Sequence, residues 1–366
     1  MGFKCGIVGL PNVGKSTLFN ALTATAAAVA ENYPFCTIEP NTGQVPVPDE
    51  RLAPLAALAK SAKAIPALQT FVDIAGLVRG ASKGEGLGNQ FLGHIREVDA
   101  IVHVLRCFED ANVVHVEGRI DPLADAETVE TELMLADLDG LERRLFGLQK
   151  LARGGDREAK QAIDLVDLVG AALREGRPAR SVAVPAERAK AFRELQLLSA
   201  KPILYVCNVE EAAVAIGNRH SAEVIARVER EGARAMVGSA RIEAEVALLE
   251  SEVERREFLA SLGLKEAGLA RLARTGYELL GLITFFTAGP KETRAWTIAR
   301  GTRAAQAAGR IHTDFERGFI AAETIAYQDY IRFGGELGAK EAGRMRQEGR
   351  DYEVKDGDVL LFRFNV

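Results

Sequence analysis

A nine-residue stretch near the start of the chain, GLPNVGKST from Gly9 to Thr17, constrains the fold more than any other part of the sequence. It fits the pattern G-x-x-x-x-G-K-[ST] and lies between an apolar run, Phe3 to Val8, and a helical pattern, Lys15 to Leu22. In this context the glycines let the backbone curl, so that its N–H groups face a phosphate at the positive end of the helix. The stretch therefore predicts a phosphate-binding loop in a strand–loop–helix unit.

The residue types in this loop match the chemistry of nucleotide binding. Lys15 is expected to reach the β- and γ-phosphates and to be catalytic, and the Ser16 hydroxyl is expected to coordinate Mg²⁺. The other loop positions in the expected phosphate-binding set are Asn12, Val13, Gly14 and Thr17. A nucleoside triphosphate with Mg²⁺ is thus the expected ligand.

A second apolar strand ends in an Asp-x-x-Gly sequence, FVDIAGL. Asp73 is expected to hold Mg²⁺ through water, and the Gly76 N–H to contact the γ-phosphate. The glycine-dense stretch that follows, GASKGEGLG, favours a loop that moves with the nucleotide state over a plain linker. In the segment between the two elements, Glu31 to Gly43, Thr37 is the first candidate for a hydroxyl ligand of Mg²⁺, with Thr42 behind it.

The residue after Asp-x-x-Gly is Leu77, where many GTPases carry a glutamine that orients the attacking water. Leucine cannot hydrogen-bond water, so either hydrolysis is very slow or another group orients the nucleophile. His115, in a loop-like stretch after the strand Ile101 to Leu105, is the expected catalytic substitute, although a packing role stays open. His94, backbone amides or a partner are the alternatives, whereas His103 alternates within an apolar strand and is expected to be structural.

The run ILYVCNVEE has polar residues where a buried strand ends, at the position of the Asn-Lys-x-Asp sequence of GTPases. Asn208 is kept, Val209 replaces the lysine, and Glu211 takes the place of the aspartate. Guanine recognition needs a carboxylate that accepts two hydrogen bonds from the base, and the longer Glu211 strains or loses this grip. Guanine specificity is therefore expected to be relaxed, while the residues alone do not select adenine. Ser239, after the next strand, completes the expected nucleotide-binding set.

Residues 126–199 show a different pattern, with apolar side chains at 4-3-4-3 spacing in two successive segments. The positions are Met134, Leu138, Leu141, Leu145 and Leu148, then Ala159, Ile163, Val166, Gly170 and Leu173. A Gly-Gly turn joins the segments, so the pattern predicts an antiparallel coiled-coil hairpin that projects from the sheet. Two helices lying on the domain are the alternative, because each seam is only about three heptads long.

Strands that alternate with helices on either side of this insertion favour an α/β fold with a mostly parallel sheet, assigned to residues 1–125 and 200–281. A new section begins at Leu282, with strands, a helix near Ala305 to Phe319, and a tight-turn sequence, Lys355 to Asp358, between two β runs. These features predict a small separate α+β domain over residues 282–366.

The composition limits the partners and the compartment. A net charge of −5 over 366 residues gives no global attraction to nucleic acid or to anionic membrane. A basic patch from Lys340 to Arg350 could contact phosphate or could be a solvated helix face. No apolar run approaches the ~18 residues of a membrane span, and the N-terminus is no signal peptide, so a cytoplasmic monomer is expected. Cys5, Cys107 and Cys207 are expected to be buried apolar groups.

Several motifs together resemble the YchF family of Obg-like ATPases over the whole chain, from Met1 to Val366. They are GLPNVGKST, NYPFCTIEPN, DIAGLVRGASKGEGLG, NVEE and the tail KEAGRMRQEGRDYEVKDGDVLLFRFNV. The resemblance implies an Obg-type P-loop domain, a helical coiled-coil insertion and a C-terminal TGS domain of β-grasp type. It implies ATP rather than GTP, with Asn12 to Thr17 on the phosphates, Ser16 and Thr37 on Mg²⁺, and Val209 in a main-chain contact to adenine. It also implies binding to ribosomes or RNA, through the coiled coil and the TGS domain.

The leading interpretation is therefore a Mg²⁺-dependent, ATP-hydrolysing switch whose outer domains contact the ribosome or RNA. A P-loop kinase for a small molecule is one alternative, although it would need an acceptor pocket and an arginine-rich lid. A scaffold that binds nucleotide without useful turnover is the other, because Leu77 cannot orient water.

Overall fold

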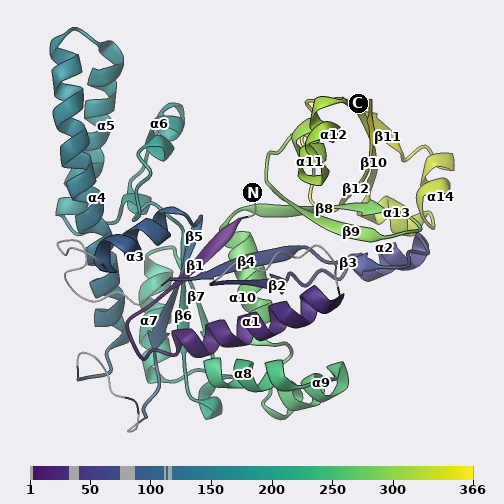
Figure 1. Cartoon of the computed structure of the whole chain (residues 1–366), viewed down its shortest axis with the longest axis horizontal. Helices are drawn as coiled ribbons and strands as arrows, with labels where there is room; N and C mark the ends of the chain where they lie inside the picture. Colours follow the sequence, from purple (N-terminus) through teal and green to yellow (C-terminus); the bar gives the residue numbers. More distant parts are fainter. Residues whose placement is uncertain (1–2, 33–40, 75–86, 111–112, 114–117, 366) are drawn as a thin grey trace. The chain divides into compact units, whose positions relative to one another are not determined.

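The chain forms two compact units in the computed structural model, which describes residues 3–32, 41–74, 87–110, 113 and 118–365 (Figure 1). The first unit comprises Met1–Ala24, Glu39–Gly43 and Phe71–Gly268. The second comprises Thr25–Ile38, Gln44–Thr70 and Leu269–Val366, so a segment from the first quarter of the chain belongs with the C-terminal part. The domain boundaries expected after residues 125, 199 and 281 stay predictions.

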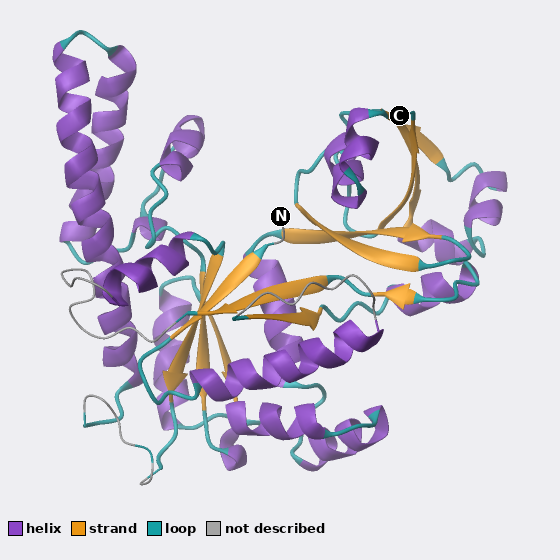
Figure 2. Cartoon of the chain, viewed as in Figure 1, coloured by secondary structure: helices purple, strands orange, loops and turns teal. Residues whose placement is uncertain are grey.

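A six-stranded sheet with the order β2-β4-β1-β5-β6-β7 carries the N-terminal part of the chain. Its strands are β1 (Lys4–Val8), β2 (Thr42–Pro46), β4 (Leu68–Asp73), β5 (Ala100–Arg106), β6 (Ile203–Asn208) and β7 (Arg234–Gly238). β1, β5, β6 and β7 pair in parallel, and every residue of β5 and β6 is buried. Continuous burial is typical of strands covered on both faces, and Figure 2 shows the strands fanning out as twisted sheets do. The predicted α/β class is confirmed.

The helices of this part are α1 (Lys15–Asn32), α3 (Leu87–Arg96), α7 (Arg219–Arg230), α8 (Ala240–Leu248) and α9 (Glu252–Ser261). The next helix, α10 (Gly268–Leu279), belongs to the second unit except for its first residue. α7 begins after Asn218, whose side chain accepts a hydrogen bond from the Ser221 N–H at 3.0 Å in a capping box. Among the described residues, no helix has the length and apolar character needed to cross a membrane.

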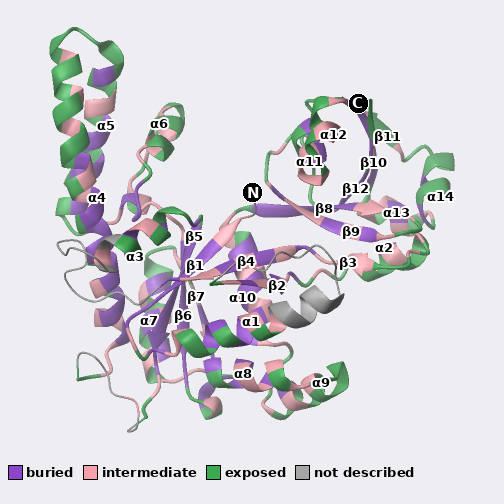
Figure 3. Ribbon diagram, viewed as in Figure 1, coloured by how far each residue is buried: buried purple, intermediate pink, exposed green. Residues whose placement is uncertain are grey.

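The predicted helical hairpin is confirmed. α4 (Pro122–Arg153) and α5 (Arg157–Arg174) run side by side away from the sheet, and a short turn joins them (Figure 1). Met134, Leu141, Val166 and Leu173 are buried in one cluster along the seam, as their spacing predicts. Figure 3 shows this inner face buried, while the outer faces and the tip of the hairpin are exposed. The turn ends at Asp156, whose carboxylate accepts from the first free N–H groups of α5.

The second unit is an α+β structure around another six-stranded sheet, with the order β11-β10-β12-β8-β9-β3. Its strands are β3 (Ala64–Ile65), β8 (Leu282–Ala288), β9 (Thr293–Ala299), β10 (Phe319–Ala326), β11 (Arg346–Glu348) and β12 (Asp358–Phe364). Its short helices are α2 (Leu52–Leu58), α11 (Ala304–Ile311), α12 (Thr313–Arg317), α13 (Tyr327–Arg332) and α14 (Glu336–Glu341). Phe285 and Phe362 pack edge to face in the core, and the predicted α+β character of the C-terminal part is confirmed.

Two local predictions for the C-terminal part need correction. The single helix expected from Ala305 to Phe319 is two helices, because His312 has an extended backbone and caps α12 through its ring nitrogen. The turn from Lys355 to Asp358 forms, with Gly357 at a φ of 90°. However, the β run expected before it is wrong, since Glu353 makes only an isolated bridge.

Sequence patterns did not reveal that residues 44–70 pack with the C-terminal part. Arg51 explains much of this packing, because its guanidinium contacts Asp49 at 2.8 Å and Asp356 at 2.9 Å. The same guanidinium lies over the Phe286 ring, 5.3 Å from its centroid. β3 adds a parallel pairing with β9 at the edge of the second sheet.

Candidate nucleotide-binding site

The motif from Gly9 to Thr17 includes the loop that joins β1 to α1, and its two glycines have no room for a side chain. A Cβ on Gly9 would lie 2.6 Å from the Val104 carbonyl oxygen. Gly14 has a φ of 94°, and a Cβ there would overlap the Asn208 amide. Asn12 also adopts a positive φ of 63°. The loop is therefore a tight curl that only this residue pattern allows, as the motif predicts.

The position of β1 in the sheet puts this loop where ligands bind in α/β folds. β1 lies between β4 and β5, so the strand order changes direction beside it. The Ile74 N–H donates to the Ile7 carbonyl at 3.1 Å, which holds the end of β4 beside β1. Asp73, at the end of β4, and Asn208, at the end of β6, are thereby brought to the same edge as the loop.

Asn208 fixes the phosphate loop from behind. Its Nδ2 donates to the Val13 carbonyl at 2.9 Å, and its Oδ1 accepts from the Ala240 N–H at 2.9 Å. The side chain is buried, so both bonds are shielded from water. Asn208 therefore connects the loop to the start of α8, and its amide atoms are already engaged before any base is bound.

The residues after Asn208 form the expected base-recognition segment. Val209 is buried, and its N–H donates to the Gly238 carbonyl at 2.9 Å. Glu211 is half exposed, and its Oε1 lies 2.8 Å from Nε of Arg241, a residue that the sequence analysis did not single out. Ser239 is buried as the residue before α8. A carboxylate and an exposed arginine therefore form an ion pair at the position of the aspartate in the GTPase motif.

A cation site is supported by one unusual atom. Asp73 Oδ1 is buried and has no hydrogen-bond partner among the described residues, although a buried carboxylate oxygen normally has one. Ser16 is exposed at the start of α1, where its hydroxyl is accessible to a phosphate-bound ion. One carboxylate, one hydroxyl and phosphate oxygens are the donor set that Mg²⁺ accepts. The residues present thus fit Mg²⁺.

Three of the expected site residues lie outside the described part of the chain. They are Thr37, Gly76 and His115, together with Leu77. Of the other histidines considered, His94 lies in the last turn of α3, and His103 is fully buried in β5, as expected for a structural residue.

Arg106 was missed in the sequence, because it ends an apolar strand and carries no motif. Its side chain is buried, and its guanidinium donates to the carbonyls of Phe108, Asp110 and Val113. A buried arginine with three backbone acceptors fixes the course of the loop that follows β5. A charged residue inside an otherwise apolar strand was the available signal.

The cysteine prediction is confirmed for the three cysteines in the described ranges. Cys5, Cys107 and Cys207 are free and buried. Burial raises the pKa of the Cys5 thiol to about 12, so this thiol stays neutral.

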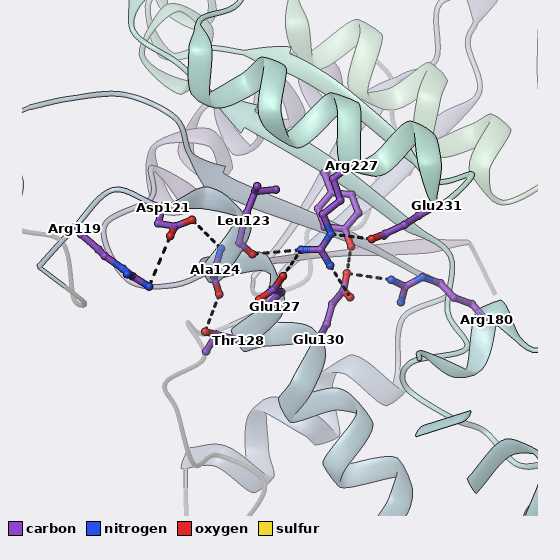
Figure 4. Close-up of polar contacts among 11 residues, drawn as sticks. Arg119, Asp121, Leu123, Ala124, Glu127, Thr128, Glu130, Arg180, Arg227 and Glu231 are labelled. Carbon is purple, nitrogen blue, oxygen red and sulfur yellow. Dashed lines mark hydrogen bonds and ion pairs between the residues drawn. The ribbon is translucent and has the colours of Figure 1, made fainter. Parts of the chain in front are cut away.

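A charged cluster around the buried Glu130 attaches the hairpin to the sheet. The Glu130 carboxylate of α4 lies 3.0 Å from Arg180 and 3.6 Å from Arg227, and the Tyr205 hydroxyl donates to it (Figure 4). Arg227 of α7 also contacts Glu231 at 2.8 Å. Of the charged groups in this cluster only Glu130 is buried, so loss of its carboxylate would leave two partly exposed guanidinium groups without this partner, which is destabilising.

His103 lies beside this cluster and gives the fold a testable pH dependence. Both ring nitrogens lack a hydrogen-bond partner among the described residues, and the ring centroid lies 5.7 Å from that of Tyr205. Burial, with the nearby charges of Arg180 and Arg227, lowers the pKa of His103 to about 3. The folded chain therefore keeps this histidine neutral where the unfolded chain protonates it.

We expect His103→Leu to make the fold less sensitive to acid. As the pH falls below the ordinary histidine pKa, the unfolded parent takes up a proton that the folded parent refuses, so its free energy of unfolding decreases. The variant lacks this loss. The free energy of unfolding of the variant minus that of the parent should rise by about 1.4 kcal/mol as the pH falls from about 7.5 to about 5.5. Urea unfolding measures both values. Parallel pH curves for the two proteins would contradict the assignment.

Comparison with known families matches two parts of the chain. The model for 50S ribosome-binding GTPases matches residues 4–133, which include the phosphate loop. The model for the C-terminal region of YchF GTPases, described as a protein of unknown function (DUF933), matches residues 282–365.

Full-length relatives are similar from end to end. The ribosome-binding ATPase YchF of Haemophilus influenzae is 56% identical over 366 residues, which is all of both chains. The protein of the same name from Bacillus subtilis is 52% identical over 368 residues, again with both chains fully covered. The solved structure of the Schizosaccharomyces pombe YchF GTPase has a TM-score of 0.89 at 37% identity, covering 99% of this chain and 98% of that one.

Proposed function

The chain belongs to the YchF family of ribosome-binding ATPases, and from that premise we propose that it hydrolyses ATP and acts as a nucleotide-dependent switch on the ribosome. One observation carries the choice of nucleotide. The Glu211 carboxylate, which would have to accept hydrogen bonds from guanine, is paired with Arg241 at 2.8 Å. A guanine would have to displace this arginine, whereas adenine offers no donor pair that needs the carboxylate.

The phosphate site is assigned residue by residue. Backbone N–H groups of Asn12, Val13, Gly14 and Thr17 surround the β-phosphate, and Lys15 neutralises charge between the β- and γ-phosphates. Ser16, Thr37 and Asp73 would hold the Mg²⁺ ion, Asp73 through water. When bound, Mg²⁺ neutralises charge that develops on the phosphate oxygens. The Gly76 N–H stabilises the γ-phosphate while water attacks its phosphorus and the bond to the bridging oxygen breaks, giving ADP and phosphate.

The base site uses the main chain. Because the Val209 N–H already donates to Gly238, a contact from Val209 to adenine would use its carbonyl, which can accept from the exocyclic amino group. Asn208 acts indirectly, by holding the phosphate loop against α8. Ser239, beside Gly238, completes the wall of this site.

The ribosome is the proposed partner, contacted by a cytoplasmic monomer. The hairpin of residues 126–199 and the C-terminal domain of TGS type, residues 282–366, are proposed to provide the contacts, with RNA among the surfaces they meet. The C-terminal part alone gives weak electrostatic support, since residues 283–366 hold 13 Lys and Arg against 12 Asp and Glu.

Nucleotide turnover with and without ribosomes tests the proposed function. We expect tighter binding of ATP than of GTP, release of labelled inorganic phosphate from ATP, and faster release when ribosomes are added. Transfer of the label to a small molecule in cell extract would instead identify a kinase. Absence of turnover, even with ribosomes, would identify a nucleotide-binding scaffold.

The base-recognition segment gives a specificity prediction. We expect Val209→Lys with Glu211→Asp to shift the ratio of ATP to GTP affinities toward GTP, because the change rebuilds a stem that packs on the ring and a shorter carboxylate. Adding Arg241→Ala should enlarge the shift to about tenfold or more, because it frees the carboxylate from its ion pair.

Glu210→Asp is the matched control for this series. It shortens the neighbouring carboxylate, which accepts from Asn218 Nδ2 at 2.9 Å and has no assigned contact to the base. Affinity ratios that are equal in the parent, the control and the triple variant would refute the base-reading argument.

A further inference from the structure

The helical hairpin has its charges separated along its length. From Pro122 to Glu142 it carries seven acidic and no basic residues. From Arg143 to Lys160, the part that forms its tip, it carries six basic and two acidic residues. The tip is thus strongly positive in a chain whose net charge is −5. Such a separation orients the positive end toward a polyanion.

Most of the cationic side chains at the tip are not neutralised by the protein. Arg143 pairs with Asp139 at 2.8 Å, and Arg144 donates to the Glu194 carbonyl at 3.2 Å. The other four are exposed, and within the described ranges they make no ion pair or side-chain hydrogen bond. They are Lys150, Arg153, Arg157 and Lys160. One of the two acidic groups, Asp156, is occupied as the cap of α5.

An aromatic ring lies among these charges. Phe146 is 78% exposed, more than any other phenylalanine in the described ranges. Arg143, Phe146, Lys150 and Arg153 are spaced 3-4-3, so they follow one another along a single face of α4. Beside this stripe is a shallow hollow of about 900 Å³, whose lining combines Arg143, Arg144 and Lys150 with Leu148, Leu151 and Asp156. Figure 3 shows the tip exposed on both helices.

We infer that the hairpin tip is a docking surface for RNA, an inference that rests on the proposed ribosome-dependent function. The exposed ammonium and guanidinium groups can neutralise backbone phosphates, whose binding releases counterions. The Phe146 ring provides a stacking platform for an unpaired base between them, a combination typical of single-stranded nucleic-acid sites. An acidic protein surface would satisfy the charges but would give the ring no specific role, and RNA is therefore the occupant.

Charge reversal at the tip tests the phosphate contacts. The full-length double variant Lys150→Glu, Arg153→Glu is compared with Arg256→Glu, Lys265→Glu, which changes the same charge at exposed positions outside the hairpin. The probe is a short, fluorescent RNA stem–loop with an unpaired loop of mixed sequence. We expect the tip variant to bind at least about tenfold more weakly and to lower the slope of log affinity against log salt by about two. The control should bind like the parent.

The ring is tested separately. Phe146→Ala should weaken RNA binding by about tenfold with an unchanged salt slope, because a stacking contact rather than a charge is lost. Phe146→Tyr should restore binding. Leu248→Ala removes an apolar side chain that is equally exposed but lies outside the hairpin, and it should have no effect. Circular dichroism and basal ATP hydrolysis, which the tip does not serve, confirm that each variant is folded.

The outcomes separate this inference from the proposed function. RNA binding that is lost in the tip variants and kept in both controls supports the inference. If the parent binds RNA in this way but fails to co-sediment with ribosomes, only the proposed function is contradicted. Parent-like RNA binding by the tip variants overturns the inference. It is also overturned if co-sedimentation with ribosomes needs the tip while the stem–loop is not bound by the parent, since the partner is then an acidic protein surface.

Discussion

ATP hydrolysis should fall by roughly a thousandfold in Lys15→Ala, because the charge that develops on the γ-phosphate then has no ammonium to stabilise it. The loop itself should persist, since Asn208 and the glycines rather than Lys15 fix its course. Stopped-flow release of phosphate at saturating ATP measures the loss. Lys265→Ala, at an exposed position away from the loop, is the matched control.

Substitution of Ser16, the expected Mg²⁺ ligand, should also reduce ATP hydrolysis. Ser16→Ala should lose hydrolysis to a similar extent, whereas Ser16→Thr keeps the hydroxyl and should retain most of it. In titrations, Ser16→Ala should also need more Mg²⁺ to reach its residual rate. Unchanged turnover in both Lys15→Ala and Ser16→Ala would refute the assigned site.

The phosphate loop and the hairpin seam could be predicted because each depends on short-range sequence. The glycines of the loop are dictated by a local curl, and the neighbouring Val104 carbonyl confirms how little space that curl leaves. The seam needs only helical periodicity, and the buried cluster around Leu141 and Val166 follows it. Local motifs and helical periodicity can be interpreted from a sequence without knowing which distant segments are in contact.

Contacts between segments far apart in the sequence could not be predicted. Nothing in the spacing of Asn208 indicates that its amide would bridge Val13 and Ala240, because three segments far apart in the chain meet there. The same holds for Arg241, whose importance depends on its contact with Glu211. The base site was therefore predicted as a motif, and its electrostatics emerged only from the fold.

Arg51 and Arg106 show why polar residues in short elements are difficult to interpret from sequence. Arg51 precedes a seven-residue helix and is recognised as structural only through Asp356, more than 300 residues away. Arg106 ends a strand whose other residues are apolar or buried, and its acceptors are backbone carbonyls that carry no sequence signature. Both side chains do structural work that residue type alone does not specify.

The second large effect that we expect is on turnover, when the group that orients the attacking water is removed. Leu77 follows Asp-x-x-Gly and cannot hydrogen-bond water, so another group must orient it. His115 is our candidate. His115 belongs to the segment that follows β5. Arg106 fixes the start of this segment through hydrogen bonds to the carbonyls of Phe108, Asp110 and Val113.

His115→Ala should leave ATP affinity nearly unchanged, since no phosphate contact is assigned to it, and should lower turnover by roughly ten- to a thousandfold. Single-turnover rates separate these two effects. His94→Ala tests the alternative histidine, in the last turn of α3, and should hydrolyse ATP at the parent rate. Leu77→Gln alone should change little. A parent-like rate for His115→Ala together with a slow His94→Ala would show that the wrong histidine was chosen.

Arg106 links this prediction to the structure. Arg106→Met keeps much of the buried volume but removes the donors to the loop carbonyls, so the loop loses its fixed course. If His115 orients the water, Arg106→Met should slow turnover as well, and combining it with His115→Ala should add little, because both act on one step. Independent, multiplicative losses would mean that the loop acts through another group. If neither variant slows hydrolysis, the backbone or a ribosomal group orients the water, and ribosomes should then raise the basal rate of the parent and of His115→Ala by the same factor.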